Sequence, residues 1–193
     1  MRLLLIGPPG SGKGTQAKVI AEHFGIAHIS SGELLRRHIA EKTPTGRIAA
    51  EYVERGDLVP DGVVMDILRK PVEAASRRGG YVLDGFPRTV AQAEAAYLVA
   101  KEVDAWVQVA LSLEVPRDQL IERMLRRANS EGRGDDTEAV MRHRIEIFEE
   151  ITPPLLEYYA RREVLLRIDG SRPIDEVSAS IIAELERVRP TLR

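Results

Sequence analysis

The sequence predicts an α/β fold in which a mainly parallel sheet carries helices on both faces. Two observations support this prediction: short apolar runs alternate with helical patterns along the 193 residues, and Pro or Gly punctuates the chain between them, as at 59–62 and 78–80. Parallel strands need long crossover connections, which helices usually provide. At this length the chain is expected to form a single domain, residues 1–193, that buries its own core.

Five apolar runs are expected to form the strands: residues 3–6, 27–30, 81–84, 105–111 and 164–169. Helical patterns cover residues 13–24, 32–55 (interrupted near Pro44), 61–77, 89–101, 116–127, 137–160 and 174–188. Two segments fit the alternation poorly: residues 30–60 hold two helical patterns without a strand between them, and residues 127–137 are polar and contain glycine. Ligands bind beyond the carboxyl ends of the strands in such sheets, so both segments are candidate covers over a site.

The composition argues against several classes of function. The absence of cysteine rules out disulfides, thiolate zinc sites and thiol nucleophiles. The opening apolar run stops at Gly7 and is too short for a secretory signal or a membrane span, so we expect a soluble cytoplasmic protein without a membrane partner. The net charge is −2, and acidic residues are interleaved with the arginines of 117–144, which argues against nucleic-acid binding.

Residues 7–16 (GPPGSGKGTQ) nearly fit the phosphate-binding pattern G-x-x-x-x-G-K-[ST], but Gly14 stands where the pattern has a hydroxyl and Thr15 comes one residue later. A strand is expected before this stretch and a helix after it, which is the context that such a loop requires. Its glycines let backbone amides turn inward around an anion, and Lys13 can reach the terminal phosphates of a nucleotide. The alternative is an ordinary glycine-rich turn. Gln16 and Lys18 are expected on the surface of the helix.

A second constellation follows the predicted strand 81–84, which ends in a carboxylate and is followed by Arg88. An acid at the carboxyl end of a strand beside a phosphate loop is well placed to hold Mg²⁺, directly or through water. The alternative role for Asp84 is that of a helix cap or turn residue. We favour a functional role for Asp84 and Arg88 together, because both are expected at the edge of the sheet where ligands bind.

Three stretches together resemble the nucleoside monophosphate kinase family, and most closely its adenylate kinases: residues 7–16, residues 84–89 (DGFPRT) with Gln92, and residues 132–136 (GRGDD) followed by Arg142 and Arg144. The resemblance runs from Met1 to about residue 186. It implies a P-loop nucleoside-kinase three-layer fold with a five-stranded parallel sheet. It also implies a core of residues 1–29, 60–125 and 137–193, a nucleotide-monophosphate-binding excursion at 30–59 and a lid at 126–136.

The implied reaction is the reversible transfer of a phosphoryl group from MgATP to AMP, giving two ADP and balancing the adenine nucleotides. The implied ATP contacts are the loop residues Gly10, Ser11, Gly12, Lys13, Gly14 and Thr15, together with Arg123, Arg127 and Arg172. In the family, an arginine matching Arg123 stacks on the adenine and one matching Arg127 reaches the phosphates. The position of Arg172 receives the adenine amino group on its backbone carbonyl.

The resemblance also implies an AMP pocket and a set of catalytic cations. The implied AMP contacts are Ser31, Arg36, Asp57, Leu58, Val59, Gly85, Phe86, Pro87, Arg88, Gln92, Arg133 and Arg144. Among them, Gln92 would pair with the base, while Arg133 and Arg144 would close on the phosphates beside the lid residues Asp135 and Asp136. The implied catalytic residues are Lys13, Arg88, Arg127, Arg133 and Arg144.

These residue types suit phosphoryl transfer, which depends on alignment and charge neutralisation more than on a protein nucleophile. The expected cofactor is Mg²⁺ held with ATP, with Asp84 acting through water. Zinc is not expected, because the short lid has no cysteine ligands and the four histidines have no metal-ligand spacing. Lid closure would keep water from competing for the phosphoryl group. No feature demands an oligomer, so a monomer is expected.

The sequence departs from the adenylate pattern at the acceptor site. Ser31 and Glu33 stand where adenylate kinases usually carry Thr and Asp, and kinases of pyrimidine monophosphates often have Glu at the second position. Ser31 keeps a hydroxyl for the base, and Ser30 with Glu33 also satisfies a helix capping box. Gln92 follows the adenylate pattern, so AMP is favoured, with a CMP or UMP kinase of the same fold as the alternative. The alternative outside catalysis is a nucleotide-dependent switch or binding module.

Overall fold

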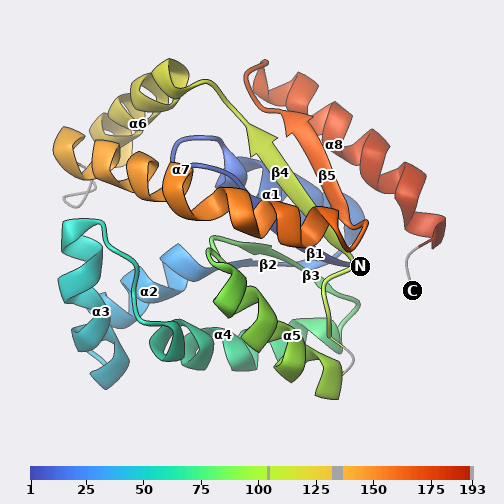
Figure 1. Cartoon of the computed structure of the whole chain (residues 1–193), viewed down its shortest axis with the longest axis horizontal. Coiled ribbons are helices and arrows are strands. Elements are labelled where there is room, and N and C mark those ends of the chain that lie inside the picture. Colours follow the sequence, from blue (N-terminus) through green and yellow to red (C-terminus); the bar gives the residue numbers. More distant parts are fainter. Residues whose placement is uncertain (104, 132–136, 192–193) are drawn as a thin grey trace.

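The computed structural model describes residues 1–103, 105–131 and 137–191, with the side chains of residues 127–131 excepted. Its sheet contains five parallel strands: β1 (Arg2–Ile6), β2 (Ala27–Ser30), β3 (Tyr81–Asp84), β4 (Val109–Glu114) and β5 (Leu165–Asp169). They lie in the order β2-β3-β1-β4-β5, so the first strand is central (Figure 1). The predicted five-stranded parallel sheet is confirmed.

Helices cover both faces of the sheet, as the alternating pattern predicts. The described helices are α1 (Lys13–Phe24), α2 (Ser31–Ala40), α3 (Pro44–Arg55), α4 (Asp61–Ser76), α5 (Val90–Glu102), α6 (Arg117–Glu131), α7 (Glu138–Ala160), α8 (Ile174–Val188) and the short 3₁₀ turn η1 (Arg189–Thr191). No helix in the described parts of the chain is both long enough and apolar enough to cross a membrane.

The side chains of β1 alternate between two cores, since successive residues of a strand point to opposite faces. Leu3 and Leu5 pack with α1 and α8, whereas Leu4 and Ile6 pack with α4, α5 and α7 on the other face. All four side chains are at most 5% exposed. This division into two cores gives the three layers of the fold and leaves the strand ends free to carry a site.

Three predictions need correction. Strand β4 begins at Val109, four residues later than predicted, because the preceding segment makes isolated contacts with its neighbours: the Tyr81 hydroxyl donates to the Ala105 carbonyl at 2.8 Å. It runs on to Glu114, where it pairs with β5. Helix α6 continues to Glu131, four residues beyond its predicted end at residue 127. Residues 126–131, the first part of the predicted lid, are therefore helical.

The third correction concerns Gln16, which was expected on the helix surface and is 3% exposed. Its side-chain amide donates to the Ile174 carbonyl at 3.2 Å and accepts from the Ser178 hydroxyl at 2.9 Å. Gln16 therefore connects the phosphate-loop helix α1 to α8. Its contacts come from residues more than 150 positions away, which no local pattern reveals.

The excursion between β2 and α4 consists of α2 and α3 without an intervening strand, as the two helical patterns predict. Helix α3 begins at Pro44, and the Thr43 hydroxyl caps it by accepting from the Gly46 amide at 3.0 Å. A Cβ at Gly46 would lie 2.0 Å from the His38 carbonyl oxygen, so only glycine allows this approach of α3 to α2.

We expect Gly46→Ala to destabilise the protein by about 1–3 kcal/mol, because the added methyl group collides with backbone rather than with a movable side chain. Urea denaturation followed by circular dichroism measures the change. The matched control is Gly62→Ala in α4, where an added Cβ meets nothing within 4 Å. Equal stability of the two variants would contradict the role given to the α2–α3 contact.

Candidate active site

The phosphate loop connects β1 to α1 and is shaped by two glycines with positive φ, Gly10 at 82° and Gly12 at 92°. A Cβ at Gly10 would lie 2.8 Å from the Leu120 carbonyl oxygen and 2.7 Å from Cγ of Met124, so the loop rests directly on α6. Left-handed backbone and this close approach both require glycine at position 10. The contact positions the loop against the helix that carries Arg123.

The amino end of α1 points its backbone amides into this loop. The Gln16 amide bonds to the Gly12 carbonyl at 3.0 Å, and the amides ahead of it precede the helical ladder, where an anion is favoured. The Lys13 ammonium donates to the carbonyls of Gly7 and Pro8 at 2.7 and 2.9 Å. Thr15 is exposed, as a ligand contact requires, whereas the Ser11 hydroxyl is buried without a partner among the described residues.

Asp84 ends β3 and is aligned with Leu5 of β1 and Ser30 of β2. It is 9% exposed, and its Oδ2 lies 3.8 Å from a Cβ built on Gly14, so the carboxylate faces the start of α1. No described residue donates a hydrogen bond to it. A largely buried carboxylate that faces a phosphate loop and retains its acceptor capacity suits a hard cation with oxygen ligands, so the residues present fit Mg²⁺.

Arg88 follows a turn that contains a cis peptide bond between Phe86 and Pro87. Its Nε donates to the Gly85 carbonyl at 2.9 Å, and its backbone amide donates to Oε1 of Gln92 at 2.7 Å. The surrounding protein lowers the pKa of the Arg88 guanidinium by desolvation, although the residue keeps surface open to the cleft; Asp84 raises the pKa and Arg144 lowers it. An arginine remains charged at neutral pH under such shifts, so two cations face the same space.

A cavity of about 230 Å³ lies beyond the carboxyl ends of β1, β2 and β3. All the predicted AMP contacts within the described residues line it: Ser31, Arg36, Asp57, Leu58, Val59, Gly85, Phe86, Pro87, Arg88, Gln92 and Arg144. Lys13 and Asp84 line it as well, which brings the phosphate loop and the predicted acceptor pocket to one space. Arg133, Asp135 and Asp136 lie outside the described residues.

The Gln92 side chain is 3% exposed and bonded at both ends. Its oxygen accepts from the Arg88 amide at 2.7 Å, and its nitrogen donates to Oδ1 of Asp61 at 2.6 Å. Gln92 therefore joins the start of α4 to the Arg88 turn. The sequence interpretation missed Asp61, because a Val-Pro-Asp-Gly stretch indicates only a helix entry; its partner lies 31 residues away.

Ser31 is 2% exposed, and its hydroxyl has no partner among the described residues. A Cβ built on Gly85 would lie 2.6 Å from that oxygen, so the turn after β3 covers it closely. The neighbouring Ser30 hydroxyl accepts from the Glu33 amide at 3.4 Å, which supports the capping interpretation of this pair.

Helix α7 contributes an apolar wall that sequence reasoning did not assign to the site, formed by Ile147, Phe148, Ile151 and Leu155. The sequence shows the helical periodicity of this segment, but it does not show which cavity the helix borders. The same helix contacts the excursion, because Nη2 of Arg144 donates a hydrogen bond to the Val53 carbonyl of α3 at 3.1 Å.

His143 of α7 contacts the same excursion, because its Nε2 lies 2.9 Å from Oδ1 of Asp57. This hydrogen bond, and a second one from Arg55, lower the pKa of Asp57. The carboxylate therefore stays ionised at neutral pH and favours the contact between α7 and the excursion.

The predicted adenine contacts meet on the opposite side of the phosphate loop. The Arg123 guanidinium donates to the carbonyls of Gly170 at 3.0 Å and Ser171 at 3.2 Å, so α6 lies against the loop that follows β5. The next residue of that loop, Arg172, donates to the Ser180 hydroxyl at 3.0 Å. Arg127 lies one helical turn beyond Arg123 in α6, and its side chain is outside the described part.

No group of three or more metal-ligating side chains (His, Asp or Glu) occurs among the described residues. Three of the four described histidines contact other side chains: His23 contacts Glu186, His38 contacts Thr43, and His143 contacts Asp57. The candidate cation position is therefore the single carboxylate of Asp84, which would have to share the metal with a ligand that brings its own oxygens.

The fold and the site define a class of protein: an α/β enzyme that binds nucleotides on a glycine-rich loop and gathers cations around a second pocket. Comparison with known proteins narrows this class. The family model described as adenylate kinase matches residues 5–164. The chain belongs to the adenylate kinase family.

Curated relatives match over nearly their whole length. The chain is 43% identical over 186 residues to an adenylate kinase of Kocuria rhizophila, covering 96% of this chain and 99% of the relative. It is 45% identical over 183 residues to an adenylate kinase of Thermus thermophilus, covering 95% and 96%. A protein named adenylate kinase 1 from Nostoc sp. is 42% identical over 184 residues, covering 95% and 98%.

We expect Asp61→Ala to weaken AMP binding about tenfold, because the Gln92 amide loses a charged acceptor worth about 1.5–3 kcal/mol and is no longer held against the Arg88 turn. Calorimetric titration with AMP measures the effect. The matched control is Asp66→Ala, because Asp66 is an exposed residue further along α4. Unchanged AMP affinity in Asp61→Ala would show that Gln92 needs no support from α4.

Proposed function

We propose that the chain catalyses the reversible transfer of a phosphoryl group from MgATP to AMP, producing two ADP and so maintaining the adenine nucleotide balance. The observation that carries this proposal is the shared cavity: Lys13 of the phosphate loop and Arg88, Arg36 and Arg144 of the acceptor side line one space of about 230 Å³. Membership of the adenylate kinase family supports the same reaction.

The proposed chemistry is electrostatic. Lys13 and Arg88 hold the transferring group, and Arg144 neutralises the acceptor phosphate, so donor and acceptor oxygens are held in line while charge is offset. Arg127 and Arg133 complete the set of cations by resemblance to the family. Asp84 would hold Mg²⁺ through water beside the ATP phosphates, and the ion would further neutralise the phosphate charge.

The proposed AMP pocket uses the excursion and the Arg88 turn. Arg36 and the backbone of residues 57–59 surround the nucleotide, while Gln92 faces the base. Ser31 can reach the base once its hydroxyl turns out from beneath the covering turn. On the ATP side, Arg123 and the backbone of Arg172 flank the adenine, and Asp135 and Asp136 belong to the proposed lid at 126–136.

The acceptor preference separates this proposal from a pyrimidine monophosphate kinase. Coupled assays of ADP formation with AMP, CMP, UMP and dAMP compare kcat/KM directly. We expect AMP to exceed CMP and UMP by at least about 10²-fold, the range of discrimination available to a shaped pocket. Higher kcat/KM with CMP or UMP would overturn the assignment, and absence of ADP from ATP, AMP and millimolar Mg²⁺ would favour a nucleotide-binding module instead.

Replacing Lys13 or Arg88 by Ala is expected to lower kcat by about 10²–10³-fold, because each removes a preorganised charge from the transferring group. Circular dichroism and thermal melting check that both variants stay folded. The control is Arg77→Ala, whose exposed guanidinium lies 3.8 Å from Glu73 in α4 and whose loss should leave kcat unchanged. Near-normal turnover of either site variant would refute its role.

We further propose that the enzyme acts as a cytoplasmic monomer on small nucleotides, without a nucleic-acid or membrane partner and without zinc. The net charge of −2 and the lack of cysteine support this proposal. Size-exclusion chromatography with light scattering tests the oligomeric state against the 21.5 kDa mass of the chain.

A further inference from the structure

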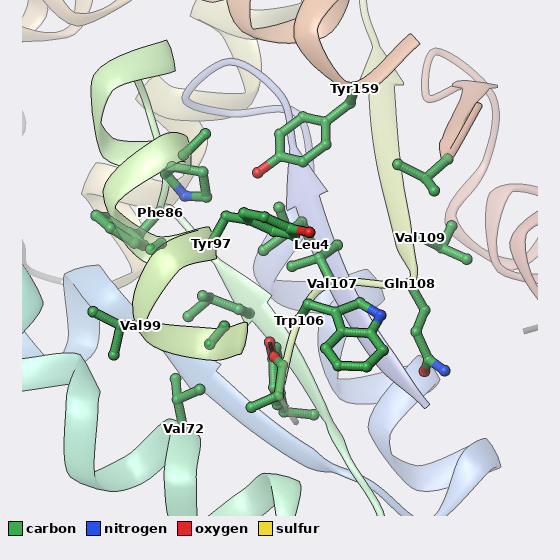
Figure 2. A pocket seen from close by; sticks show the side chains of 18 of the residues that line it. Leu4, Val72, Phe86, Tyr97, Val99, Trp106, Val107, Gln108, Val109 and Tyr159 are labelled. Carbon is green, nitrogen blue, oxygen red and sulfur yellow. Dashed lines mark hydrogen bonds between the residues drawn. The ribbon is translucent and has the colours of Figure 1, made fainter. Parts of the chain in front are cut away.

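A second cavity, about 760 Å³ in volume, lies on the α4–α5–α7 side of the sheet, separate from the phosphate loop. Its size falls within the range of small-molecule binding sites, which are mostly apolar with a few polar groups. The sheet contributes Leu4 and Leu83, and the segment before β4 contributes Trp106 and Val107. Figure 2 shows Leu4, Trp106 and Val107 bordering a common space.

The exposed apolar residues of α5 explain why this space is a candidate site. Tyr97, Val99 and Val103 are 45%, 36% and 44% exposed, and all three line the cavity. Tyr97 extends from α5 into it (Figure 2). Exposed apolar surface costs roughly 25 cal/mol per Å², so a ligand that covered these side chains would remove that cost.

Tyr159 of α7 gives the cavity a polar group. The residue is 6% exposed, its hydroxyl points into the cavity in Figure 2, and no described residue bonds to that hydroxyl. Two other polar features of the lining are engaged: the Tyr81 hydroxyl donates to the Ala105 carbonyl, and Arg69 pairs with Glu73 at 3.3 Å. Burial raises the pKa of Tyr159, so its hydroxyl remains both donor and acceptor at neutral pH.

We propose that this cavity is a binding site for a neutral, flat, mainly aromatic small molecule with one hydrogen-bonding group that pairs with the Tyr159 hydroxyl. Aromatic side chains in the lining, Tyr97 of α5 and Trp106 before β4, favour a planar ligand. The lining carries charges of both signs, including the paired Arg69 and Glu73 and Arg162 over the Tyr158 ring, so a charged ligand would meet like charges as well as opposite ones.

The site shares a wall with the acceptor cleft. Phe86 and Pro87 line both cavities, and they connect Asp84 to Arg88. A ligand that presses on this turn therefore bears on the position of the Arg88 guanidinium. This second part of the inference rests on the proposed function, whereas the existence of the site does not.

The probe is N-phenyl-1-naphthylamine, a neutral three-ring compound with one N–H, whose fluorescence rises in apolar surroundings. Trp106 is the single tryptophan of the chain and lines the cavity, so energy transfer from Trp106 to the probe reports occupancy of this site. We expect one probe per chain, which stays bound when a diadenosine pentaphosphate occupies the nucleotide site, with at most a few-fold change in affinity through the shared wall. Complete displacement by that mimic would overturn the proposal, because the probe would then occupy the nucleotide cleft.

Two variants on α5 form a matched pair. Ala96 lines the cavity, so Ala96→Phe should fill part of it and weaken probe binding at least about tenfold. Leu98 lies outside the lining and is 67% exposed, so Leu98→Phe should leave binding unchanged. Equal affinity of these two variants for the probe would overturn the site.

Tyr159→Phe removes only the hydroxyl and should lower the affinity for the probe about fivefold, which is the usual contribution of one hydrogen bond. Thermal melting of each variant distinguishes lost binding from lost folding. The link to the acceptor cleft is measured by the KM for AMP, which should change at least about twofold with saturating probe. An unchanged KM for AMP with bound probe would overturn the link to the acceptor cleft but not the binding site itself. A protein that binds the probe but lacks kinase activity would count against the proposed function alone.

Discussion

The parallel pairing of β1 with β3 is the constraint on which the rest of the site depends. Leu5 is aligned with Asp84, and Asp84 with Ser30, so three strands end at the same edge. Each strand then releases a different segment there: the phosphate loop, the Arg88 turn and the excursion. Because a parallel sheet places the carboxyl ends of all its strands at one edge, groups far apart in sequence come together there. A one-residue slip of β3 would turn Asp84 to the opposite face.

Cations gathered at this edge make the cleft ready for an anion. Burial is the main cause that lowers the pKa of Arg88; Asp84 raises this pKa, and Arg144 lowers it, as expected of like charges that share one space. The protein holds them there through hydrogen bonds to its own carbonyls: Lys13 to Gly7 and Pro8, Arg88 to Gly85, and Arg144 to Val53. Phosphate binding would relieve the repulsion, so part of the free energy spent in assembling the site is recovered when the nucleotide arrives.

Local patterns predicted most of the fold. The alternation of apolar runs located all five strands, and the start of α8 at Ile174 and the end of α1 at Phe24 match the predicted boundaries. The predicted start of β4 was wrong because residues 105–107 are apolar, as buried strand residues are, yet they do not pair with a neighbouring strand. An apolar pattern reports burial and not strand pairing.

The parts of the site that short sequence motifs encode could be predicted. The parts that depend on contacts between distant elements could not. Glycine spacing marked the phosphate loop, and the acid after β3 marked Asp84. Asp61 and Gln16 could not be assigned, since each acts through a partner in a distant element. The second cavity was equally hidden, because its lining comes from several helices and the sheet, and no single segment shows a binding pattern.

The proposed recognition of the base by Gln92 would use the hydrogen-bonding groups that its side-chain amide has left free of protein contacts. Its oxygen is committed to the Arg88 amide and its nitrogen to Asp61, which also fixes which atom is which. An amide nitrogen carries two hydrogens and a carbonyl oxygen two lone pairs, so one donor and one acceptor remain. That pair complements an acceptor beside a donor, an arrangement that adenine and cytosine both present.

Gln92 alone therefore cannot separate AMP from CMP, and the choice must come from the shape of the pocket. Its walls are Leu35 and Val64 on one side and Phe148 and Leu155 on the other, all apolar. A purine covers more of such a surface than a pyrimidine does, and each extra buried group adds favourable transfer free energy. Ser31, smaller than the usual Thr by one methyl group, widens the pocket near the base, so it favours the larger ring without opposing the pairing with Gln92.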